Sequence, residues 1–523
     1  MMNLKFKNEI AGRFLKGEFM QKFNGKILVV GCGSVSQCTI PLLLQLLDMD
    51  AKNITVMDFV DNRDRVKPSL AKGVRYVVDR ITKENYATLL KKYLSEGDIF
   101  IDLAWDIDTM SLLDWCHHNG VRYINTSIEL WEPYKEAENR HPTDFTLYVR
   151  HMALRKMIAS WKNPKGPTMI IDHGANPGLV SHFTKQALLD IASRILKEKP
   201  RDPRREAFEK ALANEDFPRL AFLAGVKVIH ISERDTQITN KPKEVNEFVN
   251  TWSIPGLIEE AIAPSEIGWG THERHIPKGA LGHKSGPRNQ ICLRQKGMHT
   301  WVRSWVPAGE ITGMVIRHGE AFSISEYLTL WHKDKVTYRP TVHYAYCLPD
   351  VAVNSLHEFE MRGYNPQPRR RIMQDEIISG EDQLGCLLMG HDFKSWWTGS
   401  VLSIDETRRL VPGQNATTLQ VAISVVAAVI YMIKNPELGF HLPDYLDHKE
   451  ILKIAKPYLG QMVSKPVDWT PLQSKLNRYE YNGHKPDLKD HWQFMNFLVH
   501  PMEKEPSPLT NGHRPKRTAT LAR

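Results

Sequence analysis

The sequence has few cysteines, and their spacing suits neither a disulfide framework nor a zinc site. Six cysteines are spread over 523 residues, and no two have the C-x-x-C spacing. The first 25 residues also lack the apolar centre of a secretory signal, because charged residues occur throughout them. These absences predict a reduced, cytoplasmic setting and no bound metal.

A long hydrophobic run and a basic stripe are also missing. The most apolar stretch, residues 421–433, is too short to cross a bilayer and is typical of a buried helix. The net charge of +9 includes +3 from residues 503–523, which are predicted to form a disordered basic tail. We interpret the tightest basic run, residues 369–371, as a solvated loop. The sequence therefore predicts no membrane segment and no nucleic-acid binding.

Residues 1–172 contain short apolar runs that alternate with amphipathic stretches. The runs predict strands at 26–30, 53–59, 74–78, 98–104, 121–126 and 168–172. The stretches between them predict helices at 34–47, 83–93, 109–118 and 144–161. This alternation is typical of an α/β fold with a doubly wound parallel sheet of the Rossmann type.

The rest of the chain has a different character. Residues 173–412 are rich in tryptophan, histidine and strand-like runs, including 226–231, 314–316 and 321–325. They predict a mixed α+β domain with an antiparallel sheet, for catalysis and dimerisation. Residues 413–502 are predicted to be a helical segment that packs back on the Rossmann domain.

A glycine-rich turn follows the first predicted strand and begins a helix, as a dinucleotide site requires. Gly31 permits a tight turn, and Gly33 lets the backbone approach a pyrophosphate at the helix N-terminus. Ser36 replaces the third glycine of the usual pattern. Asp58 ends the second strand and can bind ribose hydroxyls, which favours NAD over NADP, although Arg63 and Arg65 lie close enough to weaken that inference. Further cofactor-binding candidates are Ser34, Val35 and, at the end of the fourth strand, Asp102.

The middle of the chain combines carboxylates with aromatic residues. Glu233, Trp252 and Glu260 supply the elements of an ammonium site, because carboxylates neutralise a cation and an indole face attracts it. Glu129 ends the fifth strand, where ligands of open α/β sheets bind. Asn176 lies in a Gly- and Pro-containing turn, which could equally be a helix cap.

Several long strings resemble bacterial-type homospermidine synthases, which are relatives of the saccharopine dehydrogenase-like enzymes. They are DHGANPGLVS (172–181), HISERDTQ (230–237), VNTWS (249–253), EIGWGTHER (266–274), YRPTVHYAY (338–346), QNATTLQV (414–421) and DWTPL (468–472). The resemblance extends from about residue 24 to residue 500. It implies an NAD-dependent transferase that oxidises putrescine, or spermidine, to an imine. A second diamine attacks the imine, ammonia leaves, and the same reduced cofactor yields homospermidine.

The resemblance also implies roles for individual side chains. Trp252 resembles the indole that holds cationic intermediates, and Glu233 the carboxylate that binds and deprotonates the substrate amine. Asn176 resembles the group that positions the reacting amine. Glu129 and Glu260 resemble further acidic ligands, His318 appears at the place of a site histidine, and a homodimer is expected. Two other functions stay open: a saccharopine- or carboxynorspermidine-type dehydrogenase with net dinucleotide turnover, and a noncatalytic NAD sensor.

Overall fold

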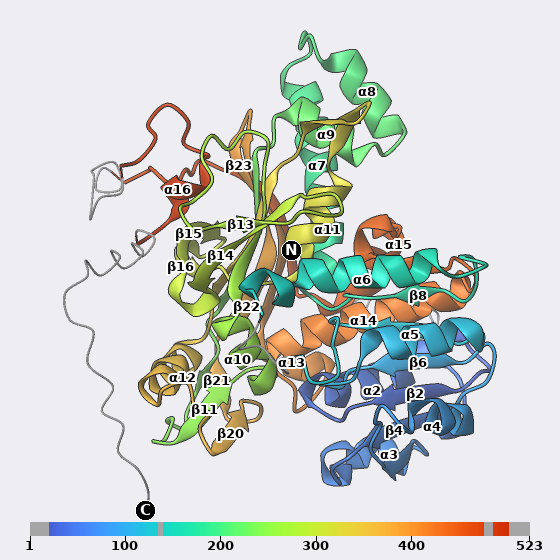
Figure 1. Cartoon of the computed structure of the whole chain (residues 1–523). Helices are drawn as coiled ribbons and strands as arrows, with labels where there is room; N and C mark the ends of the chain where they lie inside the picture. The colour runs from blue at the N-terminus through green and yellow to red at the C-terminus, as the bar shows by residue number, and fades with distance from the viewer. Residues whose placement is uncertain (1–19, 134–139, 475–484, 501–523) are drawn as a thin grey trace, which may run out of the picture.

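A seven-stranded parallel sheet carries the N-terminal part of the chain in the computed structural model, which describes residues 20–133, 140–474 and 485–500. Across the sheet the strands are β24 (Phe440–His441), β8 (Met169–Ile170), β7 (Arg122–Asn125), β6 (Ile99–Asp102), β2 (Ile27–Val30), β4 (Ile54–Asp58) and β5 (Arg75–Val78). The helices between them are α2 (Ser34–Leu46), α3 (Lys67–Ala71), α4 (Tyr86–Tyr93), α5 (Thr109–His118) and α6 (Leu147–Ala159). The predicted Rossmann class is confirmed (Figure 1).

Two predicted helices begin later than their patterns suggest. The start of α4 is delayed to Tyr86, because the Asn85 side chain accepts from the Thr82 amide and donates to the Arg80 carbonyl in a turn. The stretch 144–161 divides into a short 3-10 turn and α6, whose first residues are capped by the Thr146 hydroxyl. Side-chain hydrogen bonds thus set both boundaries.

A ten-stranded mixed sheet forms the second domain. It contains β9 (Val228–Asp235), β12 (Pro264–Gly268), β13 (Leu281–Gly282), β14 (Gln290–Lys296), β15 (Trp301–Val306), β16 (Gly309–Met314), β19 (Thr341–Cys347), β22 (Glu381–His391), β23 (Lys394–Ser403) and β25 (Gln461–Val467). Most neighbours are antiparallel, as predicted, but β9 and β19 run parallel at the centre. The strand predicted at 321–325 is wrong, since these residues lie in helix α11 (Gly319–Tyr327), and of 314–316 only Met314 ends a strand. All of 319–325 is buried, and a short buried run does not distinguish helix from strand.

Smaller elements surround this sheet. The helices are α7 (Leu179–Glu198), α8 (Arg205–Ala213), α9 (Phe217–Ala224), α10 (Ile254–Ile262), α12 (Asp350–Met361) and α13 (Ile404–Leu410). The two-stranded pairs are β1 (Gln21–Lys22) with β3 (Leu47–Asp48), β10 (Ile238–Thr239) with β21 (Ile377–Ser379), β11 (Glu247–Asn250) with β20 (Arg369–Ile372), and β17 (Leu330–His332) with β18 (Lys335–Tyr338). Residues 369–371 therefore form a strand and not the predicted loop, although Arg369 and Arg370 are solvated as predicted. They form β20, and the Arg371 guanidinium pairs with Glu247 and Glu376 at 2.8 and 2.9 Å.

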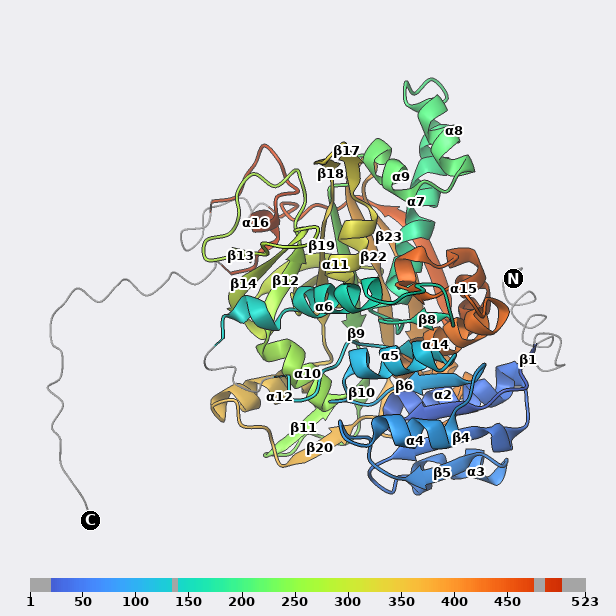
Figure 2. The same cartoon turned by 45° about the vertical axis from the view of Figure 1, so that its right-hand side comes forward.

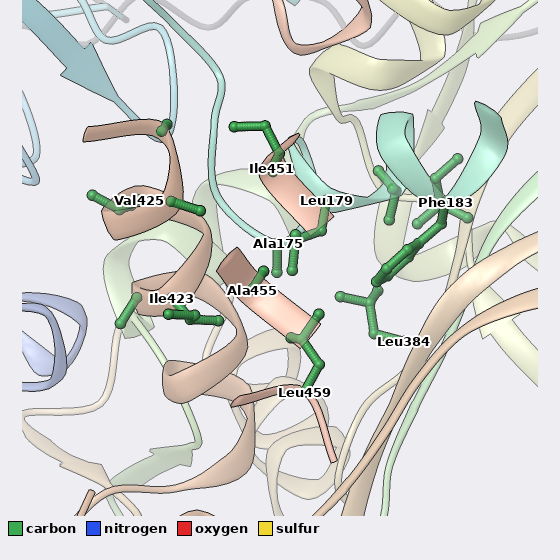
Figure 3. Packing of buried hydrophobic residues seen from close by; sticks show 14 of the residues in the cluster. Ala175, Leu179, Phe183, Leu384, Ile423, Val425, Ile451, Ala455 and Leu459 are labelled. Carbon is green, nitrogen blue, oxygen red and sulfur yellow. The ribbon is translucent and has the colours of Figure 1, made fainter. Parts of the chain in front are cut away.

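The C-terminal part of the chain joins both domains. Helix α14 (Ala416–Lys434) contacts α2 and α15 (His448–Ala455), and it lies between the two sheets in Figure 1. Figure 3 shows Ile423 and Val425 on this helix near Leu179 and Ile451, within one apolar cluster. This segment also supplies β24 to the first sheet and β25 to the second, so it is not only helical. The short helix α16 (Phe494–Phe497) follows, and the predicted basic tail lies outside the described residues.

One helix of the described residues, α14, is long and apolar enough to cross a membrane. However, 89% of its most apolar stretch is buried inside the fold. This agrees with the buried helix predicted at 421–433, which the structure extends at its N-terminal end. Its apolar character is explained by packing against both domains.

Candidate active site

A cavity of about 1100 Å³ lies between the carboxyl ends of the parallel strands and strand β20. Its lining includes the predicted cofactor residues Gly31, Gly33, Ser34, Val35 and Asp58. Figure 2 shows β20 facing the end of the Rossmann domain that carries β4 and β5. The cavity therefore opens where doubly wound sheets bind nucleotides.

The glycine turn is shaped for a close ligand. Gly31 has a φ of +89°, and a Cβ there would lie 2.7 Å from the Leu103 carbonyl oxygen. Gly33 precedes α2 without a side-chain cap, and no atom lies within 4 Å of the place of its Cβ. The free amides and the open space at this helix start fit a pyrophosphate.

Asp58 and Asp102 occupy different positions relative to the cavity. The Asp58 carboxylate accepts from the Cys32 amide at 2.6 Å and the Val60 amide at 2.9 Å, which holds it at the end of β4. The Asp102 carboxylate instead accepts from the Tyr123 hydroxyl at 2.7 Å, is buried, and does not line the cavity. Burial raises the pKa of Asp102 to about 6. Asp58 can reach a nucleotide, whereas Asp102 supports the strand ends beneath it.

Glu233 is the centre of a second, buried cluster. Strand β9 places its side chain 2% exposed, and one carboxylate oxygen, Oε2, accepts both from Asn176 Nδ2 at 3.0 Å and from the Tyr344 hydroxyl. Burial and, to a smaller extent, Asp235 raise the pKa of Glu233, while the Tyr344 and Asn176 donors and His318 oppose the shift, and the resulting pKa is about 8. A carboxylate with such a pKa can take and return a proton near neutral pH.

Trp252 is connected to this carboxylate by two tyrosines. Its indole Nε1 donates to the Tyr346 hydroxyl at 3.0 Å. The Tyr346 ring is stacked on that of Tyr344, with centroids 5.1 Å apart and planes within 6°. Tyr344 then donates to Glu233. The structure therefore brings the predicted indole, base and asparagine together through a stack that the sequence analysis did not single out.

Two more buried carboxylates belong to the same sheet face. Asp235 lies on β9, two positions after Glu233, and Asp382 on β22 is directly opposite Asp235. Asp235 accepts from the Thr251 and Thr417 hydroxyls at 2.8 and 3.1 Å. Burial, and then the Glu233 and Asp235 carboxylates, raise the pKa of Asp382 well above its ordinary value. Sequence analysis missed Asp382 because only the pairing of β22 with β9 brings it here.

His318 lies between two buried carboxylates. Its Nε2 is 3.2 Å from Glu260 and its Nδ1 is 3.4 Å from Glu320, and its ring centroid is 4.6 Å from that of Tyr344. Burial lowers the pKa of His318, but the two carboxylates outweigh it and hold the pKa well above the ordinary value. Burial raises the pKa of Glu260, which His318 opposes. The predicted histidine and glutamate therefore form one charged unit at the edge of the Glu233 cluster.

Glu129 is buried and does not line the cavity, but its neighbour Glu259 accepts from the lining residue Trp105 at 3.5 Å. Glu129 accepts from the Ser127 hydroxyl at 2.8 Å, and burial together with Glu259 raises its pKa to about 7. Glu259 is paired with Arg150 at 3.0 Å and with Arg317. Carboxylates therefore extend from beside the cavity to the Glu233 cluster.

The string EIGWGTHER has a structural role here. Glu266 accepts from the first amides of α6, at 2.8 Å from Leu147, and so ties the second sheet to the Rossmann domain. Glu273 accepts from the Phe494 amide at 3.0 Å and anchors the C-terminal helix α16. Neither glutamate borders the cavity.

Taken together, the described residues place a nucleotide-sized cavity beside a buried, carboxylate-rich cluster with an indole. Among the described ranges no group of His, Cys, Asp and Glu is arranged to hold a metal ion. The cavity can hold a dinucleotide, and the cluster can bind an amine, neutralise it by removing a proton and stabilise a cation that forms afterwards.

Comparison with known proteins gives consistent matches. A family model described as the saccharopine dehydrogenase NADP binding domain matches residues 27–170, and one described as the saccharopine dehydrogenase C-terminal domain matches 174–467. The chain is 38% identical to homospermidine synthases of Mesorhizobium japonicum and Blastochloris viridis. Each match covers 91% of this chain, with 97% and 98% of the relatives. The fold is similar to the crystal structure of homospermidine synthase from Legionella pneumophila in complex with NAD, with a TM-score of 0.81 and 38% identity. This match covers 92% of this chain and 99% of the other.

Proposed function

The chain belongs to the homospermidine synthase family, and from that premise we propose that it binds NAD and transfers an aminobutyl group from putrescine, or spermidine, to putrescine. The resemblance of the sequence motifs to this family is confirmed by the two relatives and by the similar fold. The glycine turn and Asp58 would hold the NAD, which would supply a reversible hydride acceptor, so that the net reaction would be a transfer. Side chains of this protein carry out the other steps, which are binding of the amine, proton removal and stabilisation of the cation.

The observation that carries the proposal is the buried carboxylate cluster beside Trp252. A protein of net charge +9 repels a dication at long range, so a diamine needs local negative charge. Glu233, Asp235 and Asp382 lie together on one sheet face, and a bound ammonium group would favour their ionised forms. A carboxylate-bearing substrate, as the dehydrogenase alternative requires, would be repelled by the same cluster.

Proton removal falls to Glu233. A hydride leaves an amine-bearing carbon only when the amine is neutral, and the carboxylate accepts the ammonium proton. Asn176 and Tyr344 hold one oxygen of Glu233 in place, and Asp382 contacts the same carboxyl group. The cation that reappears on the substrate carbon–nitrogen bond is stabilised by the face of Trp252. Burial of the cluster keeps water from hydrolysing the imine.

We assign the remaining predicted residues to the second diamine. Glu129 and Glu260 offer carboxylates to the distal ammonium group, and protonated His318 keeps Glu260 ionised. They guide the second diamine toward the imine. We also propose that the protein acts in the cytoplasm as a homodimer. The resemblance implies the dimer, and the six unpaired cysteines, all within the described residues, suit a reducing compartment.

The test is a turnover experiment with limiting cofactor. Purified protein is incubated with putrescine and substoichiometric NAD, and homospermidine, ammonia and reduced NAD are measured. We expect many homospermidine molecules per NAD and no accumulation of the reduced form. One reduced NAD per product would instead indicate the dehydrogenase, and NAD binding without product would indicate the sensor. Light scattering of the purified protein tests the dimer.

A further inference from the structure

Strand β20 presents three consecutive arginines in two directions. Arg369 pairs with Glu244, and Arg371 pairs with Glu247 and Glu376. Alternate residues of a strand point to opposite faces, so Arg370 projects away from the face on which these partners lie. Arg370 is exposed and lines the large cavity. No carboxylate of the described ranges is within ion-pair distance of it.

A chain of hydrogen bonds ties this region to the glycine turn. Gln374, in the loop after β20, donates from Nε2 to Gln37 Oε1 at 3.3 Å. Gln37, in the first turn of α2, donates from its own Nε2 to the Cys32 carbonyl at 3.0 Å. The second domain is therefore attached to the backbone that surrounds Gly33. This attachment brings the β20 end of the cavity to the start of α2.

We propose that Arg370 binds the pyrophosphate of the dinucleotide from the side opposite the glycine turn. Backbone amides at the start of α2 supply hydrogen-bond donors but no full charge, and a pyrophosphate carries two negative charges. A guanidinium without a carboxylate partner can donate two parallel hydrogen bonds to phosphate oxygens. This inference rests on the proposed use of NAD.

The other arginines of the lining are not placed to bind the pyrophosphate from the second domain without a carboxylate partner. Arg65 and Arg80 lie with Asp58 and Asp79 on the Rossmann side, and the Arg80 guanidinium stacks on the Phe59 ring at 5.6 Å. Arg371 also borders the cavity, but its charge is balanced by two carboxylates. Arg370 is the cation that the second domain contributes without such balance. Cofactor binding would consequently hold the two domains together.

The experiment compares Arg370→Gln with Arg369→Gln in the full-length protein. The two substitutions remove the same charge from adjacent positions, but Arg369 faces Glu244 and not the cavity. Calorimetric titration with NAD, ADP-ribose and adenosine separates binding of the pyrophosphate from binding of the nucleoside. We expect Arg370→Gln to lower the affinity for NAD and for ADP-ribose by about tenfold. Its affinity for adenosine should stay unchanged. Arg369→Gln should bind all three ligands as the unmodified protein does.

Other outcomes distinguish the two proposals. Unchanged NAD and ADP-ribose affinity in Arg370→Gln overturns the assignment, and so does an equal loss of adenosine affinity. Failure of the unmodified protein to bind NAD would instead count against the proposed function. Arg370→Lys keeps the positive charge, so its NAD affinity should fall between those of arginine and glutamine. Thermal unfolding without ligand checks that each variant is folded.

Discussion

Replacing Tyr344 with phenylalanine should move the pH dependence of amine oxidation to higher pH. The Tyr344 hydroxyl donates to Glu233, and this hydrogen bond stabilises the ionised carboxylate. Burial has already raised the pKa of Glu233 to about 8. The base is active when ionised, so the rate should rise with pH through that value. Loss of the Tyr344 hydroxyl raises the pKa of Glu233 further, so the rate should rise at a higher pH.

The size of the shift follows from the strength of the lost bond. A hydrogen bond to a charged group contributes about 1.5–3 kcal/mol. Because a free-energy difference of 1.36 kcal/mol corresponds to one pKa unit, the pKa of Glu233 should increase by about 1–2 units. At pH 8 the ionised fraction would fall from about one half to between about 0.1 and 0.01. The rate at that pH should therefore decrease by about 5- to 50-fold, while the plateau at high pH stays near its original height.

The assay is a single-turnover measurement of NAD reduction by putrescine at a series of pH values from about 6 to 10. Tyr346→Phe is the matched control, because the Tyr346 hydroxyl accepts from Trp252, whereas the Tyr344 hydroxyl donates to Glu233. In this control variant the rate of NAD reduction should still rise with pH near pH 8. If Tyr344→Phe lowers the rate at the high-pH plateau but does not change the pH at which the rate rises, the assignment of Glu233 as the base is refuted.

Further predictions concern the indole and two buried charged groups. Trp252→Ala should reduce turnover strongly and leave NAD affinity intact, as measured by kinetics and calorimetry; loss of NAD affinity would make Trp252 structural. Arg317→Met leaves the buried Glu259 with Arg150 as its remaining cation, so chemical denaturation should show about 1.5–3 kcal/mol less stability, and no change would contradict the pairing. The folded-state pKa of His318 is raised, so its stabilising contribution is complete below pH 6.5 and decreases as the pH rises toward the folded value. His318→Gln should remove this pH dependence of the unfolding midpoint, and an unchanged profile would show that Glu260 does not keep the ring protonated.

Much of the site could be predicted because its residues follow recognisable local patterns. Gly31 and Asp58 follow apolar strands at the spacing of a dinucleotide fold, and Glu233 and Trp252 lie in long family strings. Asp382 lies in none of these strings, and Tyr346 lies in one of them without a pattern that indicates its role. They become neighbours of Glu233 only through the order β19–β9–β22, which depends on pairing between distant segments.

The same limit explains the errors in the fold. The apolar run at 321–325 satisfies both helix and strand patterns, and packing between elements decided in favour of α11. The arginines of β20 have the composition of a solvated loop, but Glu247 and Glu376 neutralise Arg371 within a sheet. Strand β24 has two residues and carries no periodic signal at all.

Strand β24 has a consequence for how the protein is made. The β8 edge of the Rossmann sheet is covered by residues 436–441, with hydrogen bonds from Thr168 and Met169 to Pro436 and Gly439 at 2.9 Å. During synthesis, residues 1–172 leave the ribosome long before this cover exists. Until then the β8 edge of the nascent domain has unpaired backbone hydrogen-bonding groups, which are prone to pair with strands of other chains. A chaperone that shields this edge during translation should therefore increase the yield of soluble protein, more than one that acts after release.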